Sequence, residues 1–468
     1  MTDATTAMAG KPAPLRHRIA KAGSWVLIGH VVTQGVRLGT NVVLARLLSP
    51  DAFGLMSVVY ILVIGMALFS DIGIVRSVVQ SKRGDDPDLL DTAWTIQVVR
   101  GLGLGVFSFL VAGAIALAAH WGLSSATTVY GDPRLPWIVA AFSSVAILAG
   151  FESIRVGLAR RNMQLRLLTR IDIVSQLVAA VAMMALAWTF HSIWALVAGA
   201  VITGAVRCGM GQWMLPGHRE RLRMVPDAVA ELMGHGKWIF LSSILGFIAI
   251  NGDRLMLGGL IDKQSFGLYS VAFMLVNTLQ VVASTLCMNV AYPAIAEVHR
   301  ERPHEIAGTL RKFQWAYDGL VVFLAACLIS AGPQIIHVLY DARYQGAGWI
   351  MVVLAIGAIG TRYQIVEQAY QAVGRPSLVT LANLLRLLAL VAGILLGHRF
   401  FGMQGAIFGI ALSQFAAWPV AWWFKARVGG FNWRSEAALV PAVAAGLAVG
   451  WVLAQALIRL VPAHFLHH

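Results

Sequence analysis

Hydrophobic stretches alternate with short polar segments along the whole chain. Runs of roughly 20 or more mostly apolar residues can cross a hydrocarbon core about 30 Å thick, so the pattern predicts an all-α polytopic membrane protein with about 12–14 spans. We expect these spans at 22–46, 53–80, 91–119, 135–158, 166–190, 193–214, 237–259, 266–296, 308–330, 348–371, 377–397, 403–425 and 436–460.

A tight turn after the first span recurs in the second half of the chain. The segment LLSPDAFGLMSVVYIL begins at Leu47, and the similar segment LIDKQSFGLYSVAFML begins at Leu260. The Phe-Gly-Leu motif at 53–55 therefore aligns with the motif at 266–268. Because each copy joins two long apolar segments through a short polar turn, the repeat predicts two homologous halves in the same orientation.

The repeat sets the expected domain boundaries. They are a cytoplasmic tail at 1–21, a first lobe of six helices at 22–215, a cytoplasmic inter-lobe linker at 216–236, a second lobe of six helices at 237–427, and an extra C-terminal segment at 428–468. The linker 216–236, with HRERLR near its start, is compatible both with an amphipathic helix on anionic lipid and with a solvated connection. The extra segment holds one further span, which leaves the side of the C-terminus open.

Charge changes this picture in two ways. The composition, 58% hydrophobic and 12% charged, excludes an ordinary soluble protein. The formal net charge is +14, but most lysine and arginine residues fall in alternate short connections. Membrane topology requires such a distribution, so it predicts a cytoplasmic N-terminus and no nucleic-acid partner.

A polar stripe follows one face of the first span. His30, Gln34, Arg37 and Asn41 are spaced four, three and four residues apart, which places them on one side of a helix. A cation near mid-span is costly unless it faces water, a partner or an anionic ligand. We expect Gln34, Arg37 and Asn41 to face a substrate cavity, whereas His30 fits a hydrogen-bonded seam between helices better.

The second half carries its own intramembrane charges. Glu367 lies in the span 348–371, where buried carboxylates of transporters commonly bind protons or cations. The alternative for Glu367 is a static ion pair that orders helices. We expect Glu367 and Asp253 to couple transport to an ion. The arginines expected to line the cationic cavity together with Arg37 are Arg254, Arg362 and Arg386.

Four further arginines lie nearer the cytoplasmic ends of the first-half spans, namely Arg76, Arg100, Arg155 and Arg207. Long cationic side chains at span ends can extend to the membrane interface. Several cations in a low-dielectric cleft also focus electrostatic potential, so these arginines could instead guide an anionic headgroup into a cytoplasmic entrance. Both interpretations stay open.

Signatures of catalysis are missing from the sequence. It contains no Walker A, HExxH or GxSxG motif, and its three cysteines lack paired or metal-ligand spacing. We therefore expect no enzymatic activity, no metal and no cofactor. Energy for transport would come from an ion gradient, the membrane potential or consumption of the product.

The segments LARLLSPDAFGLMSVV and FSDIGIVRSVVQ resemble the start of the polysaccharide transporter family, the Wzx-type lipid-linked oligosaccharide flippases of the MOP superfamily. YDARY at 340–344, GRP at 374–376 and the small-residue run 402–413 are similar to that family's second half.

The resemblance implies a multi-pass flippase of the bacterial inner membrane, with two lobes in a V around a cationic cavity. It would move an undecaprenyl-pyrophosphate-linked oligosaccharide outward by alternating access. It also implies membrane lipids, a polymerase and glycosyltransferases of the same pathway as partners. Guanidinium groups suit such a substrate because they bind oxyanions bidentately.

Three other functions compete with this one. A drug or cation antiporter of the same superfamily would need acidic groups, whereas the expected intramembrane set is mostly arginine. A membrane polysaccharide polymerase or ligase would need long outward loops, and the longest expected here, 120–134, is of ordinary length. A structural scaffold would not need buried charges.

Overall fold

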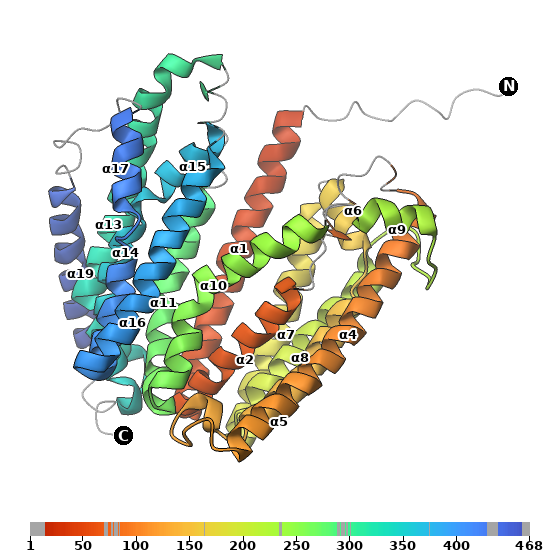
Figure 1. Ribbon diagram of the computed structural model, residues 1–468, viewed down its shortest axis with the longest axis horizontal. Helices are drawn as coiled ribbons and strands as arrows, with labels where there is room; N and C mark the ends of the chain where they lie inside the picture. The colour runs from red at the N-terminus through yellow and green to blue at the C-terminus, as the bar shows by residue number, and fades with distance from the viewer. Residues whose placement is uncertain are drawn as a thin grey trace. The chain divides into compact units, whose positions relative to one another are not determined.

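The computed structural model describes residues 15–69, 74–75, 78, 83, 85–162, 164–233, 236–287, 291, 295, 298–299, 301–373, 375–427 and 439–460 (Figure 1). Within these ranges the regular secondary structure is helical, apart from one isolated antiparallel bridge between Thr128 and Asp262. Nine of the described helices are long and apolar enough to cross a membrane, and a pair bent by 57° provides a tenth candidate. The prediction of an all-α polytopic membrane protein is confirmed.

The chain forms two compact units that do not follow the order of the sequence. Unit 1 takes its described residues from Met1–Val43, Phe69–Leu110 and Ala140–Leu241, and unit 2 takes the others. Residues 44–68 and 111–139 therefore belong with the second half of the chain. The lobe boundaries proposed from the repeat stay a prediction.

Unit 1 is built around helix pairs that pack closely. A Cβ atom on Gly101 would lie 2.5 Å from the Gly150 Cα, and one on Gly105 would lie 2.8 Å from Ile147 Cγ1, so α4 and α5 touch almost backbone to backbone. The helices that contribute to this unit are α1 (Leu15–Leu47), α4 (Pro87–His120), α5 (Leu135–Gly150), α6 (Arg155–Arg161), α7 (Leu165–Phe190), α8 (Trp194–Met214) and α9 (Pro226–Met233).

Unit 2 contains the remaining helices. They are α2 (Pro50–Phe69), α10 (Gly236–Leu260), α11 (Lys263–Leu286), α13 (Ile306–Leu339), α14 (Ala347–Ile359), α15 (Gln364–Ala372), α16 (Pro376–Ser413), α17 (Trp418–Arg427) and α19 (Val440–Leu460), with the 3₁₀ turn η5 (Gly360–Tyr363).

Two of the expected spans in unit 2 are broken. The span expected at 348–371 is divided into α14 and α15 by η5, and the span expected at 403–425 is divided at Gln414 between α16 and α17. The two breaks touch, because a Cβ on Gly360 would lie 2.7 Å from the Gln414 Cβ. Trp418 Nε1 also donates a hydrogen bond to the Gly360 carbonyl at 2.9 Å. The break in one span therefore packs against the break in the other.

Glycines also allow close contacts between other helical segments of unit 2. Gly402, at φ 59° and ψ −144°, folds α16 back on itself. The two arms meet where a Cβ on Gly405 would lie 2.1 Å from the Gly397 carbonyl oxygen. The extra helix α19 packs along α13 (Figure 1). A Cβ on Gly446 would lie 2.5 Å from the Phe323 carbonyl oxygen, so small residues allow this close approach.

The two Phe-Gly-Leu motifs pack against each other in unit 2. A Cβ on Gly267 would lie 1.9 Å from the Pro50 carbonyl oxygen, and one on Gly54 would lie 3.0 Å from the Lys263 carbonyl oxygen. The repeated turn therefore joins the start of α2 to the start of α11. Glycine is required at 267 because a Cβ there would displace backbone, whereas a Cβ at 54 would make a tight contact.

Connections between helices gather around this contact and form what we name the loop cluster, residues 48–51, 127–134, 261–263 and 340–344. Asp132 is its central charge: both oxygens accept hydrogen bonds from Arg134, and Lys263 Nζ donates to Oδ2 at 3.0 Å. Arg134 also pairs with Asp51 at 2.7 Å.

The bonds around Asp132 also set its acidity. Burial by itself raises the pKa of the Asp132 carboxyl, but the hydrogen bonds from Arg134 and Lys263 outweigh burial and hold the pKa well below its ordinary value. Asp132 is therefore an ionised, fully paired group at neutral pH.

Candidate functional site

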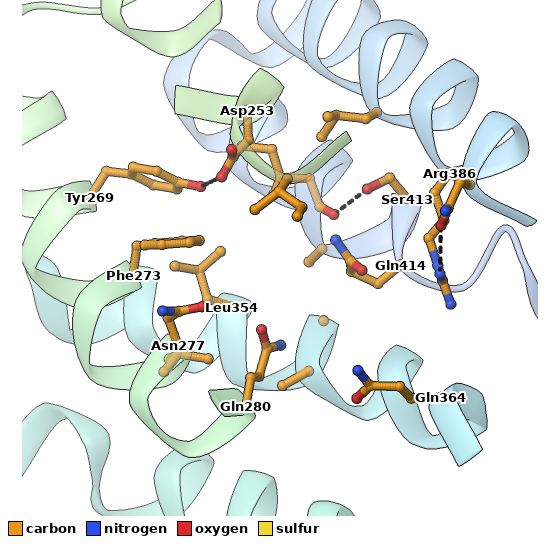
Figure 2. A pocket seen from close by; sticks show the side chains of 18 of the residues that line it. Asp253, Tyr269, Phe273, Asn277, Gln280, Leu354, Gln364, Arg386, Ser413 and Gln414 are labelled. Atoms are coloured by element: carbon orange, nitrogen blue, oxygen red, sulfur yellow. Dashed lines mark hydrogen bonds between the residues drawn. The ribbon is translucent and has the colours of Figure 1, made fainter. Parts of the chain in front are cut away.

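A polar cavity of about 390 Å³ lies inside unit 2 (Figure 2). Helices α10, α11, α14, α15 and α16 all contribute to its wall. The side chains with polar groups that line it are Asp253, Tyr269, Asn277, Gln280, Gln364, Glu367, Asn383, Arg386, Ser413 and Gln414. Its volume lies in the lower part of the range of small-molecule sites, about 300–1,000 Å³. In a unit made of apolar helices, this concentration of polar groups marks it as the candidate site.

An ion pair between Glu367 and Arg386 forms one side of the cavity. The pairing is bidentate, with one contact of 3.2 Å from Nη1 to Oε2 and a second from Nη2 to Oε1. Arg386 Nη1 also reaches the Asn383 side-chain oxygen at 3.4 Å. Arg386 Nε is buried and has no hydrogen-bond partner among the described residues. The guanidinium therefore keeps one unused donor beside the cavity.

The helix that carries Glu367 is held in place by apolar packing. Ile365, Val366, Ala369 and Tyr370 of α15 belong to a buried hydrophobic cluster. The Tyr370 ring packs edge-on against Phe424 of α17, with centroids 4.7 Å apart. Because α15 buries this apolar face, its other face presents Gln364 and Glu367, three residues apart, to the cavity.

Asp253 of α10 forms the opposite side of the cavity. Figure 2 shows the Tyr269 hydroxyl directed at this carboxylate, and it donates a hydrogen bond to Oδ2. Asp253 Oδ1 is buried and accepts no hydrogen bond from the described residues. The nearest cation is Arg254, whose Nε lies 3.7 Å from that oxygen. A buried carboxylate oxygen without a donor is costly and needs an explanation.

Arg254 lies behind the cavity wall and does not line the cavity. Its guanidinium stacks over the Phe273 ring at 4.2 Å from the centroid and donates to the Asn251 side-chain oxygen at 2.6 Å. Phe273 and Asp253, which Arg254 contacts, both line the cavity. Arg254 thus acts on the site through its neighbours.

Arg362 is also absent from the cavity wall as the structure describes it. It sits in η5 and pairs with Asp318 of α13, with Nη2 2.8 Å and Nε 3.2 Å from Oδ2. Gln314 donates to the same carboxylate oxygen at 3.1 Å. The charge of Arg362 is thus neutralised by Asp318 inside the helix packing, and its expected role in a cationic cavity stays a prediction. The spacing of Gln314 and Asp318, four residues apart, was the sequence signal for this partner.

The polar stripe of the first helix belongs to the other unit. In α1, Arg37 is exposed, Gln34 and Asn41 are half-buried, and the His30 side chain lies outside the described residues. The residues that line the cavity all belong to unit 2. A substrate-binding role for Gln34, Arg37 and Asn41 stays a prediction.

The arginines expected at a cytoplasmic entrance differ from one another. Arg155 is only 4% exposed and directs its guanidinium at Glu220, Ser153 and the carbonyl groups of Leu215 and Gln212. The Arg155 guanidinium is thus paired within unit 1, and its role at a cytoplasmic entrance stays a prediction.

Arg207 is also paired, with Glu152 at 2.7 Å and Asp172 at 3.3 Å. Arg100 is half-buried, and Arg76 lies outside the described residues. The expected cytoplasmic entrance formed by these four arginines stays a prediction.

The charge of the cavity wall also differs from the expectation. The described wall contains two carboxylates, Asp253 and Glu367, and one arginine, Arg386. The sequence shows which charged residues lie within spans, but it does not show which of the arginines are neutralised by partners on other helices. The amides of Gln414 and Asn383 were missed, although Asn383 lies three residues before Arg386 on the same helix face.

Comparison with known proteins adds relatives from polysaccharide synthesis. Lipopolysaccharide biosynthesis protein WzxC of Escherichia coli (strain K12) is 19% identical over 403 residues, which are 86% of this chain and 79% of that protein. Succinoglycan biosynthesis transport protein ExoT of Rhizobium meliloti (strain 1021) is 21% identical over 335 residues, which are 71% of this chain and 64% of that protein.

Solved structures share the fold. The lipid II flippase MurJ, in an inward closed conformation, matches with a TM-score of 0.68 at 11% identity, over 95% of this chain and 94% of that chain. An inward-facing MATE family multidrug resistance transporter of the MOP superfamily matches with a TM-score of 0.63 at 12% identity, over 92% of this chain and 96% of that chain.

Three of these four relatives are named by a transport function: ExoT as a transport protein, MurJ as a flippase and the MATE protein as a transporter. The family model for polysaccharide biosynthesis proteins matches residues 43–348, well over half of the chain. The chain therefore belongs to the family of polysaccharide biosynthesis proteins, and its fold is that of the MOP superfamily.

Proposed function

We propose that this protein is a flippase that moves oligosaccharide repeat units, linked to undecaprenyl pyrophosphate, from the cytoplasmic to the periplasmic leaflet of the bacterial inner membrane. The product would serve O-antigen, capsule or exopolysaccharide synthesis. The observation that carries the proposal is the polar cavity inside a membrane-spanning unit of a chain from this family. The names of WzxC and ExoT support a role in polysaccharide synthesis, and that of MurJ, a lipid II flippase, supports a lipid-linked substrate.

The chemistry of the cavity suits a phosphorylated sugar. Its amide side chains both donate and accept, as sugar hydroxyls require. Arg386 holds Glu367 in the bidentate geometry that a guanidinium also gives to a phosphate. At about 390 Å³ the cavity would hold the pyrophosphate and the adjoining sugar, with the rest of the repeat unit outside it.

Glu367 and Asp253 would couple this binding to an ion. Protonation of Glu367 would weaken its hold on Arg386 and release the guanidinium for the substrate. The cytoplasmic position of the N-terminus, and a further oxyanion-binding role for Arg37, belong to the same proposal. So do the pathway's polymerase and glycosyltransferases as partners.

Translocation in proteoliposomes tests the proposal. The substrate is a lipid-linked pyrophosphate oligosaccharide, and transport is followed with and without an imposed proton or sodium gradient. We expect the parent protein to transport it, and Arg386→Gln to lose more than about tenfold because hydrogen bonds to a charged partner contribute about 1.5–3 kcal/mol. The matched control, Arg399→Gln, removes an exposed arginine at the bend of α16 and should transport normally. Folded protein that moves no lipid-linked donor would overturn the proposal.

An ion-coupled small-molecule antiporter is the second candidate. The two carboxylates in the cavity wall favour it, because they attract cations. Gradient-driven efflux of a cationic dye from the same proteoliposomes distinguishes the two functions. Dye efflux without transport of a lipid-linked donor would establish the antiporter.

A further inference from the structure

The connection after α8 begins with a non-helical strap, and the short helix α9 (Pro226–Met233) follows it. Residues 216–225, here called the strap, contain no helix. Their backbone is tied to α4: Arg221 N donates to Asp91 at 2.9 Å, Arg223 N donates to Thr95 Oγ1 at 2.9 Å, and Val225 N donates to Thr92 Oγ1 at 3.1 Å. The path of the strap is therefore fixed within unit 1.

This path turns the acidic residue of the strap inward and its cations outward. The Glu220 side chain is 1% exposed and pairs with buried Arg155 at 3.2 Å. Arg219 and Arg221 on either side are exposed, and neither guanidinium bonds to another side chain of the described chain. The HRERLR sequence thus presents a purely basic outer edge in this part of the strap.

Apolar side chains accompany these arginines on the outside. Leu222 is 68% exposed and Met224 is 55% exposed, although both are large and hydrophobic. Trp213, in the last turn of α8, is 88% exposed. Exposed apolar side chains interleaved with unpaired cations are typical of a surface that lies at a lipid interface.

The strap also lies at the right depth for lipid headgroups. It begins directly after the candidate span Trp194–Met214, and it is tied to the first turns of the candidate span Pro87–His120. Both helices therefore leave the hydrocarbon core at the level of the strap. Tryptophan is enriched at this level of a membrane, and Trp213 at the end of α8 fits that placement.

Other charged residues near the strap do not neutralise the positive charge of its outer edge. Arg223 is engaged with Asp88 of α4. Of the exposed acids on α9, Glu231 lies 3.9 Å from Arg83, and Asp227 forms no salt bridge with a described residue. Two free arginines against one aspartate keep the edge basic.

We propose that Arg219, Arg221, Leu222 and Met224, beside Trp213, form a docking surface for anionic phospholipid in the leaflet where α8 ends. The guanidinium groups would bind headgroup phosphates, and the apolar side chains would enter the acyl boundary below them. The surface lies in unit 1, apart from the cavity of unit 2, and the proposal does not depend on the transported substrate.

Native mass spectrometry of the full-length protein in detergent, titrated with phosphatidylglycerol or phosphatidylcholine, tests the surface. We expect Arg219→Gln combined with Arg221→Gln to weaken phosphatidylglycerol binding about tenfold and to leave phosphatidylcholine binding unchanged. The matched control combines Arg399→Gln with Arg459→Gln, which removes two exposed charges elsewhere and should behave as the parent. Arg219→Lys combined with Arg221→Lys should retain the preference because lysine keeps the charge.

A second variant separates the apolar contribution. Leu222→Ser with Met224→Ser should weaken binding of both lipids, and none of the four substituted side chains holds the strap to α4. Equal phosphatidylglycerol binding by the glutamine variant and its control overturns the proposal. Loss of binding in the lysine variant would also overturn it, since a charge-based lipid surface tolerates that exchange.

Discussion

Asp132 and Asp253 are both buried carboxylates of unit 2, but hydrogen bonds saturate only Asp132. Both Asp132 oxygens accept from Arg134, and Lys263 adds a further bond. Asp253 accepts one bond from Tyr269 and leaves Oδ1 without a donor among the described residues. Replacing a carboxylate whose hydrogen bonds are all made can only remove stabilising interactions. A carboxylate beside a cavity that has an oxygen without a donor can instead bind a proton or a cation.

The same contrast extends to the regions around them. The loop cluster consists of close backbone contacts and paired charges, and the cavity wall consists of polar groups that face open space. We therefore expect changes in the loop cluster to reduce stability, and changes in the cavity to reduce transport with a smaller loss of stability.

The largest loss of stability is expected from Gly267→Ala, where α11 packs against Pro50 of the loop cluster. The added Cβ would lie 1.9 Å from the Pro50 carbonyl oxygen, and backbone on both sides must move to admit it. We expect a cost of about 3 kcal/mol or more, at the upper end of overpacking effects. Thermal unfolding followed by size-exclusion chromatography in detergent measures it.

Gly319→Ala in α13 is the control, since nothing lies within 4 Å of its added Cβ. Alanine favours a helix there, so this variant should unfold at or slightly above the parent temperature. Equal unfolding temperatures for the two alanine variants would contradict the close contact between the repeated turns.

Asp132→Asn should have the next largest effect. It replaces charge-assisted bonds with neutral ones, at a cost of about 1.5–3 kcal/mol at neutral pH. The folded pKa of Asp132 lies below its ordinary value, so its ionised form stabilises the fold above the unfolded pKa of about 3.9. That contribution is lost as pH falls through the folded pKa.

The difference in unfolding temperature between the parent and Asp132→Asn should therefore shrink as the solution is acidified below about pH 4. Measurement of both proteins from pH 7 downward checks the sign. A difference that grows on acidification would show that Asp132 is not held ionised by Arg134 and Lys263.

Sequence patterns predicted the loop cluster in part. The repeated Phe-Gly-Leu turn identified the two glycines by alignment, because a repeat is visible in the sequence itself. It did not show that the two copies touch each other, which depends on how the helices pack. The close helix approach at Gly101 and Gly105 was predictable from spacing alone, since only the bare backbone is involved.

Charged residues were harder to interpret from the sequence. Arg386, Glu367 and Asp253 were expected in the site and do line the cavity. Arg362 and Arg155 look similar in sequence but are neutralised by Asp318 and Glu220, from segments 44 and 65 residues away. Periodicity places a residue on a helix face, and it cannot say which carboxylate a neighbouring helix presents.

Glu367→Gln tests whether a change in the cavity wall reduces transport more than it reduces stability. Glutamine can still accept one hydrogen bond from Arg386, whose side chain is 19% exposed beside the cavity. Solvation of the guanidinium there should limit the loss of stability to about 1–2 kcal/mol, compared with about 3–5 for a fully buried pair. Gradient-dependent turnover should fall about tenfold or more, with a smaller change in substrate binding. Unchanged coupling in proteoliposomes would leave Glu367 as a static pair that orders α15 and α16.

Asp253→Asn should reduce stability least of all these substitutions and still reduce transport. The asparagine oxygen can still accept from Tyr269, and the replaced Oδ1 accepts no hydrogen bond from the described residues, so we expect a loss of about 1 kcal/mol or less. Gradient-driven transport should nevertheless fall, because an amide cannot exchange a proton. Tyr269→Phe is the control, since it removes the donor and keeps the carboxylate ionisable. Full gradient dependence in Asp253→Asn would mean that its free oxygen marks imperfect packing, and Glu367 alone would remain as the coupling carboxylate.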